Sequence, residues 1–107
     1  MIKLNIYICC VSGYSSSILA RNLERWLSER LDEEVFAESS SFRQIKDEGE
    51  MADLILVAPQ MAWAAKEISS RFPDTPVLKI DSVDYGRGRP EPVGQKILDR
   101  IQSESES

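Results

Sequence analysis

The run ADLILVAP, residues 52–59, limits most tightly how this chain can fold. It is the most apolar stretch of the sequence, and it ends at a proline. A short, continuous apolar run of this kind is typical of a strand that is buried on both faces of a parallel sheet. The run therefore predicts an α/β protein in which helices cover both faces of the sheet.

The segments around this run alternate between short apolar stretches and amphipathic helices. Predicted strands cover residues 2–10, 33–39, 52–59 and 76–81. Predicted helices cover residues 16–31, 41–51, 60–72 and 92–102, and a Gly- and Pro-rich loop is predicted over 82–94. Strands that alternate with helices are joined by right-handed crossovers. We therefore expect a four-stranded, open parallel sheet with helices on both faces.

Length and charge restrict the class of protein. A chain of 107 residues fits a single domain, which we place at 1–103 with a flexible acidic tail at 104–107. The 13 basic and 18 acidic residues give a net charge of −5, which argues against binding to nucleic acid. No apolar stretch approaches the roughly 20 residues that span a bilayer, and two adjacent cysteines indicate thiols in a reducing compartment. These features predict a cytoplasmic protein.

Both cysteines lie at the end of the first predicted strand, directly before a serine- and glycine-rich turn. The sequence CCVSGYSSS covers residues 9–17 and leads into the helix predicted over 16–31. The first N–H groups of a helix have no partners within it and the helix dipole is positive there, so such a turn can hold an anion. The same amides lower the pKa of a thiol at the turn, and Gly13 allows the backbone to approach a ligand closely. The segment predicts a site for phosphate, or for phosphate carried on sulfur.

Alternation along the strand distinguishes the two thiols. Cys10 takes the last strand position, facing the turn, and we expect its sulfur to be exposed at the mouth of the helix. Cys9 is expected to point into the protein, where a cysteine packs as a small hydrophobic side chain. The alternative is that both cysteines only fill the core.

The turn also resembles the signature of protein tyrosine phosphatases, in which an arginine follows the cysteine at a fixed spacing. Ser16 occupies the position of that arginine in this chain. The arginine clamps the phosphate and stabilises the transition state, so poor hydrolysis is expected without it. The turn is therefore better suited to passing a phosphoryl group on. A low-molecular-weight-type phosphatase stays an alternative, as does a regulator whose thiols sense redox state or phosphorylation.

Three segments together resemble the IIB component of the bacterial sugar phosphotransferase system, in its lactose/cellobiose-type family. They are IYICCVSGYSSSIL, ADLILVAPQMAW and VLKIDSVDYG, in order and at matching separations from about Ile6 to Gly86. The resemblance implies a fold similar to that of the low-molecular-weight tyrosine phosphatases. It implies that Cys10 is the phosphorylated residue. It also implies that the phosphate is bound by the residues that follow, namely Val11, Ser12, Gly13, Tyr14, Ser15, Ser16 and Ser17.

The resemblance implies a role and partners as well. A IIB component of this family accepts a phosphoryl group from a phosphohistidine of a IIA partner. It donates that group to a sugar in the membrane-embedded IIC partner, here a β-glucoside-, cellobiose- or lactose-type disaccharide. It works in the cytoplasm with transient contact at the inner face of the membrane, and it needs no metal or other cofactor. The chain has no histidine, which fits a carrier whose donor is another protein.

The neighbouring strand ends supply the predicted rim of the site. By their positions in the family pattern, Pro59, Gln60 and Tyr85 lie on these loops. Contacts with partners are expected from an exposed rim made of Tyr14, Met61, Trp63, Tyr85, Arg87 and Arg89. Met61 and Trp63 could instead face the core, and the two arginines could be solvated. Asp81 and Asp84 lie near the site, where a phosphatase would use an aspartate as general acid; the alternative is that they cap turns and helix ends.

Overall fold

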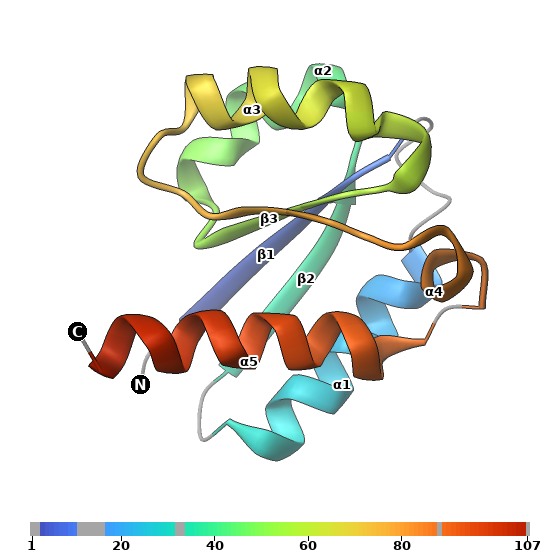
Figure 1. Ribbon diagram of the computed structural model, residues 1–107, viewed down its shortest axis with the longest axis vertical. Helices are drawn as coiled ribbons and strands as arrows, with labels where there is room; N and C mark the ends of the chain where they lie inside the picture. The colour runs from blue at the N-terminus through green and yellow to red at the C-terminus, as the bar shows by residue number, and fades with distance from the viewer. Residues whose placement is uncertain (1–2, 11–16, 32–33, 88, 107) are drawn as a thin grey trace.

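The computed structural model describes residues 3–10, 17–31, 34–87 and 89–106. Their strands form one parallel sheet in the order β2-β1-β3-β4 (Figure 1). β1 spans Lys3–Cys9, β2 spans Glu34–Ser40, β3 spans Leu54–Val57 and β4 spans Val77–Lys79. β1 and β3 are the interior strands, and every residue of β3 is buried. The prediction of a four-stranded open parallel sheet is confirmed.

Helices cover both faces of the sheet. α1 (Ser17–Arg30) and α5 (Pro90–Glu106) lie on one side, and α2 (Phe42–Glu48) and α3 (Ala65–Arg71) lie on the other (Figure 1). Two short 3₁₀ helices, η1 (Gly49–Met51) and η2 (Pro59–Ala64), flank β3, and α4 (Ser82–Arg87) follows β4. The prediction that helices cover both faces is therefore confirmed.

The side chains of the interior strands point alternately into two hydrophobic cores, one on each face of the sheet. On β3, Leu54 and Leu56 pack with α1 and α5, whereas Ile55 and Val57 pack with α2 and α3. β1 divides in the same way, and its Cys9 lies in the second core. Successive side chains of a strand point to opposite faces, so one buried strand serves both cores. This arrangement explains why Leu54–Val57 is continuously apolar rather than alternating.

The segment predicted as one helix over 60–72 is divided in the structure. η2 is a 3₁₀ helix and α3 is an α-helix, and Met61 has non-helical backbone angles of φ −109° and ψ 17°. A 3₁₀ helix has fewer residues per turn than an α-helix, so the faces of its side chains change. Met61 is buried in the core with α2 and α3, so a rim position for it is wrong and the alternative that it faces the core is confirmed. Trp63 is 65% exposed and remains at the surface.

The loop predicted over 82–94 contains a short helix and the start of a longer one. α4 occupies Ser82–Arg87, and α5 begins at Pro90, earlier than the predicted start at residue 92. Proline suits the first position of a helix because its missing N–H has no partner there in any case. α5 continues to Glu106 and so includes residues 104–106, which were expected to form a flexible tail. The domain boundary at residue 103 stays a prediction.

Close packing of α5 against α1 leads to a prediction about Gly94. A Cβ atom on this buried glycine would lie 2.4 Å from Cε3 of the Trp26 ring. The Arg30 guanidinium lies over the same ring, 3.8 Å from its centroid, so the ring has little room to retreat. Overpacking should outweigh the gain in helix propensity, and we expect Gly94→Ala to lower the free energy of unfolding by about 1–2 kcal/mol. Urea denaturation measures this loss.

Lys96→Ala is the matched control for Gly94→Ala, because Lys96 is exposed on the same helix. We expect this control to change the free energy of unfolding by no more than about 0.5 kcal/mol. Unfolding of Gly94→Ala at the same or a higher urea concentration than the parent would contradict the packing argument.

Candidate functional site

The carboxyl ends of the four strands lie in register at one edge of the sheet. Cys9 pairs with Ser40 on β2 and with Val57 on β3, and Val57 pairs with Lys79 on β4. The chain passes from β1 to β2 on one side and then returns across β1 to β3, so the strand order reverses beside β1. Ligands of open α/β sheets bind outside the carboxyl ends of the strands at such a point. Cys10, which follows β1 directly, stands there.

The peptide group that joins Cys9 to Cys10 is held from both sides. The N–H of Cys10 donates to the carbonyl of Ser40 over 2.8 Å, and the carbonyl of Cys9 accepts the N–H of Ala58 over 2.9 Å. The donor and the acceptor of one peptide plane are thus bound to the ends of the two strands that flank β1. This pair of hydrogen bonds fixes the direction in which the chain leaves β1.

The two thiols have different surroundings. Both are reduced, and Cys9 lies in the core formed with α2 and α3. The prediction that Cys9 points into packing is therefore confirmed. Cys10 is also one of the buried core residues and has no exposed surface, which agrees with the alternative that both cysteines fill the core. The expectation of an exposed Cys10 sulfur is therefore wrong: the residue follows an interior strand and is fully buried.

The surroundings of Cys9 keep its thiol protonated. Burial raises the pKa of Cys9 from 9.0 to about 11, and the neighbouring Cys10 adds to the rise. The folded protein therefore retains a proton that the unfolded chain releases near pH 9. The stability that this proton contributes is fully present below pH 9, and it is lost as the pH rises toward 11. Cys9 is a poor nucleophile at neutral pH for the same reason.

This raised pKa predicts how stability changes in alkaline solution. Between pH 9 and 11, we expect the free energy of unfolding of the wild-type protein to fall more steeply than that of Cys9→Ala. Chemical denaturation in a reducing buffer, repeated across this range, measures both slopes. All other titratable groups are the same in both proteins, so their contributions to the two slopes cancel in the difference. Equal slopes would contradict the raised pKa.

The predicted phosphate-binding residues fall largely outside the part of the chain that can be described. Val11, Ser12, Gly13, Tyr14, Ser15 and Ser16 lie outside the described residues. Ser17 is exposed and is the first residue of α1. Because α1 is the first element after Cys10, its beginning belongs to the segment that leaves the carboxyl edge of the sheet.

The predicted rim residues follow the other strands. Pro59 is half-buried and Gln60 is exposed at the beginning of η2, directly after β3. Tyr85 lies in α4 after β4, and it packs partly against the core formed with α1 and α5. Arg89 is exposed between α4 and α5, while the side chains of Asp84 and Arg87 lie outside the described ones. The topology therefore places Pro59, Gln60 and Tyr85 on segments that leave the edge at which Cys10 stands.

Asp81 has a structural role at the beginning of α4. Its carboxylate accepts the N–H of Val83 over 2.9 Å, and its carbonyl accepts the N–H of Tyr85 over 2.9 Å. An aspartate in this arrangement satisfies N–H groups that have no partner within the helix. The observation supports the interpretation of Asp81 as a helix cap rather than as a general acid.

Sequence reasoning missed a polar pair beside the cysteines. Ser40 is the only fully buried polar side chain among the described residues, and its hydroxyl donates to Oε2 of Glu48 over 2.5 Å. The next residue, Ser41, caps the following helix, because it forms a capping box with Gln44. No spacing rule pairs residues 40 and 48, since their contact depends on how α2 folds back onto β2.

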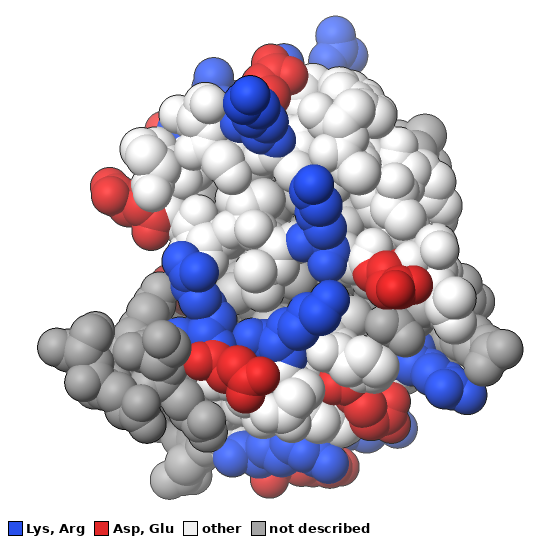
Figure 2. Space-filling model, viewed as in Figure 1, with Lys and Arg blue, Asp and Glu red and all other residues white. Residues whose placement is uncertain are grey.

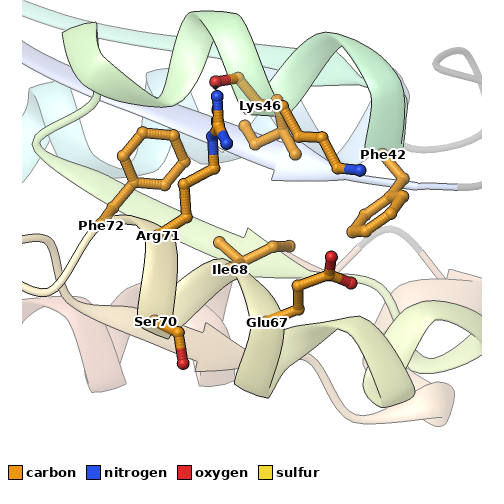
Figure 3. A pocket seen from close by; sticks show the side chains of 8 residues that line it. Phe42, Lys46, Glu67, Ile68, Ser70, Arg71 and Phe72 are labelled. Carbon is orange, nitrogen blue, oxygen red and sulfur yellow. Dashed lines mark hydrogen bonds between the residues drawn. The ribbon is translucent and has the colours of Figure 1, made fainter.

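A groove of about 320 Å³ lies between α2 and α3 (Figure 3). Ile45 and Ile68 line it together with Phe42 and Phe72, which stand at opposite ends in the view. Arg71 reaches across from α3, and its Nε donates to the carbonyl of Lys46 over 3.0 Å. None of the predicted site residues that the structure describes lines this groove. Trp63 of the predicted rim lies next to the groove, since its ring centroid is 5.2 Å from that of Phe42.

The charges are unevenly distributed over the surface. Figure 2 views the face that carries α3, β4 and α5, and basic side chains gather across its middle although the net charge is −5. Lys79 on β4 and Lys96 on α5 are both exposed. The acidic surplus is therefore not uniform over the surface.

Within the described residues, no helix is both long and apolar enough to cross a membrane. The same residues contain no cluster of three or more His, Cys, Asp or Glu side chains that could hold a metal ion.

Comparison with known proteins identifies the family. The family model for the lactose/cellobiose-specific IIB subunit of the PTS, the phosphoenolpyruvate:carbohydrate phosphotransferase system, matches residues 5–96. The chain belongs to this IIB family. PTS IIB subunits act in phosphoryl transfer during sugar uptake, together with IIA and IIC components. The family expected from the three sequence segments is therefore confirmed.

Solved structures share the IIB fold. The lactose-specific IIB component domain from Streptococcus pneumoniae matches with a TM-score of 0.77 and 20% identity, over 92% of this chain and 97% of that one. The cellobiose-specific phosphotransferase IIB component from Borrelia burgdorferi matches with a TM-score of 0.72 and 23% identity, over 95% of this chain and 94% of that one. The IIB fold resembles that of the low-molecular-weight tyrosine phosphatases, as expected from the sequence.

Proposed function

We propose that this IIB subunit is a phosphocysteine carrier and that Cys10 accepts the phosphoryl group. The observation that supports this assignment is the place of Cys10 at the carboxyl end of β1, where the strand order reverses. Its peptide N–H is bound to Ser40, so the backbone at the acceptor is fixed. Cys9 is the less suitable acceptor because it lies in the core with its proton retained.

The first transfer moves the phosphoryl group from a IIA phosphohistidine to sulfur. The Cys10 thiolate attacks the phosphorus in line; the S–P bond forms while the N–P bond breaks, and the histidine leaves with the bonding electrons. Positioning and electrostatic stabilisation of the phosphoryl oxygens dominate such transfers. Val11 to Ser17 would supply backbone N–H groups and hydroxyls for these oxygens, with the positive end of α1 beside them.

The second transfer moves the group to a sugar held by IIC. A sugar hydroxyl attacks the phosphorus; the O–P bond forms while the S–P bond breaks, and the hydroxyl proton passes to a base or to water. The Cys10 thiolate is restored and can begin another cycle. The family description supports a lactose- or cellobiose-type disaccharide as the sugar, received at the inner face of the membrane.

Both partners must reach the same sulfur in turn. Because Cys10 has no exposed surface, docking of a partner has to uncover it. Trp63 and Gln60 are exposed on η2 and are suited to contact a partner at this edge. Two partners that alternate at one site need transient interfaces of modest size.

Intact-mass spectrometry tests the proposal. The protein is incubated with phosphoenolpyruvate, the general phosphotransferase proteins and a cognate IIA. The expected result is the mass gain of one phosphoryl group, mapped to Cys10 and absent when IIA is omitted. An unchanged mass with a fully phosphorylated donor would refute the carrier. Appreciable hydrolysis of an aryl phosphate by the protein alone would favour the phosphatase alternative.

A further inference from the structure

We infer that Glu48 is a positioning residue for Cys10 and that it acts through Ser40. Ser40 is the last residue of β2, and its carbonyl accepts the N–H of Cys10 over 2.8 Å. Glu48 is the last residue of α2, and its carboxylate accepts the hydroxyl of Ser40 over 2.5 Å. The chain of contacts therefore runs from α2 through Ser40 to the backbone of the cysteine.

Burial makes the contact between Ser40 and Glu48 strong. Ser40 has no exposed surface, so water cannot readily replace a lost acceptor. A hydroxyl that donates to a carboxylate forms a charge-assisted bond, which is shorter and stronger than a bond between neutral groups. A buried donor left without its acceptor is costly. Loss of the Glu48 carboxylate should therefore make Ser40 move or its neighbours rearrange.

The charge of Glu48 also acts on β1. Burial raises the pKa of the Tyr7 hydroxyl, and the negative charges of Glu38 and Glu48 raise it further. Tyr7 lies on β1 two residues before Cys9. The Glu48 carboxylate thus influences a residue of the strand that ends at the cysteines, and it is hydrogen-bonded to the strand next to it.

The beginning of α2 is anchored at the same place. In the capping box, the Ser41 hydroxyl accepts the N–H of Gln44 over 3.2 Å, and the Gln44 side chain accepts the N–H of Ser41 over 3.0 Å. With Glu48 bound to Ser40, both ends of α2 are attached to the end of β2. A change in Glu48 should consequently be felt at Ser40 rather than absorbed within a loose helix.

The consequence for transfer rests on the proposed function. Phosphoryl transfer requires the sulfur to lie in line with the bond that breaks, and small displacements of a reacting group are costly. Glu48 acts on Cys10 through the backbone of Ser40, and we do not propose that it contacts the IIA or IIC protein. Its loss should therefore slow the transfer step while the affinity for the IIA donor is kept.

Three variants separate positioning from general destabilisation. Glu48→Ala removes the acceptor, Glu48→Gln keeps an amide oxygen at the same distance along the side chain, and Asp47→Ala removes the neighbouring exposed carboxylate. For each, kcat and KM are measured for phosphorylation by the IIA donor. Hydrogen exchange of the Cys10 amide is followed by NMR, with amides of α1 as internal references.

The expected results differ between the variants. Glu48→Ala should lower kcat by about tenfold or more with KM within about twofold, and the Cys10 amide should exchange about tenfold faster. Its α1 amides should change much less. Glu48→Gln should restore most of both values, and Asp47→Ala should match the parent.

Two outcomes would overturn the inference. One is an unchanged kcat and an unchanged exchange rate of the Cys10 amide in Glu48→Ala. The other is equal acceleration of exchange at all amides, which would mean that Glu48 only supports overall stability. If the parent protein accepts no phosphoryl group, the proposed function fails by itself, and the exchange measurement still decides whether Glu48 positions Cys10.

Discussion

Replacement of Cys10 by serine is expected to abolish phosphorylation by the IIA donor, to below about 1% of the parent rate. A serine hydroxyl remains protonated where a thiol can ionise, and it is a much weaker nucleophile than a thiolate. The initial rate and final extent of labelling from phosphoenolpyruvate measure the effect. Labelling of Cys10→Ser equal to that of the parent would contradict the assignment of the acceptor.

Cys9→Ala is the control for this experiment, because it removes a thiol that is adjacent in the sequence but is not the proposed acceptor. Cys9 lies in the core with α2 and α3, and its pKa is raised to about 11, so it is protonated at neutral pH. We expect the initial rate of Cys9→Ala to stay within about threefold of the parent. Loss of labelling in this variant, with the fold intact by circular dichroism, would assign the acceptor role to the other thiol.

Leu23→Ala is expected to be the most destabilising of the substitutions considered for the fold. Leu23 has no exposed surface and lies on α1 in the core formed with α5 and one face of the sheet. Truncation of a fully buried leucine removes apolar contacts and leaves a cavity, which costs about 2–5 kcal/mol of unfolding free energy. Urea denaturation measures the loss.

The same helix offers a matched control for Leu23→Ala. Arg25 is exposed two residues further along α1, and Arg25→Ala should change the free energy of unfolding by no more than about 0.5 kcal/mol. A loss below about 1 kcal/mol for Leu23→Ala would mean that the core around α1 is not closely packed.

The main helices and strands could be predicted because each has a clear pattern of apolar residues. The apolar residues of 16–31 recur at helical spacing, and Leu54–Val57 is continuously apolar, as its two buried faces require. Element order and the handedness of crossovers then restrict the sheet to few arrangements. The carboxyl edge, and with it the place of Cys10, follows from that order alone.

The departures occur where periodicity is a poor guide. Met61 lies in a 3₁₀ helix with irregular angles, so the single regular helix predicted over 60–72 is divided there. α4 is only six residues long, and it is followed by glycine and proline, which indicate a loop. Short helices of this kind depend on local caps such as Asp81 more than on propensity.

The candidate site was predictable to the level of residue types but not of contacts. The strand, the turn and the helix start suggested a reactive Cys10, and alternation placed Cys9 in the core. The link from Glu48 through Ser40 was not predictable, because it joins a helix end to a strand end through a fold-back that no sequence rule encodes. The enclosure of Cys10 likewise depends on the neighbouring strands, which a one-dimensional pattern does not show.

The fixed peptide between Cys9 and Cys10 has a consequence for anyone who engineers this domain. Insertion of one apolar residue into β1 would leave its composition and hydropathy almost unaltered. Because the peptide at its end is held by the neighbouring strands, the residues before the insertion would turn to the opposite faces of the sheet. The length of β1 therefore determines which face of the sheet each of its side chains occupies.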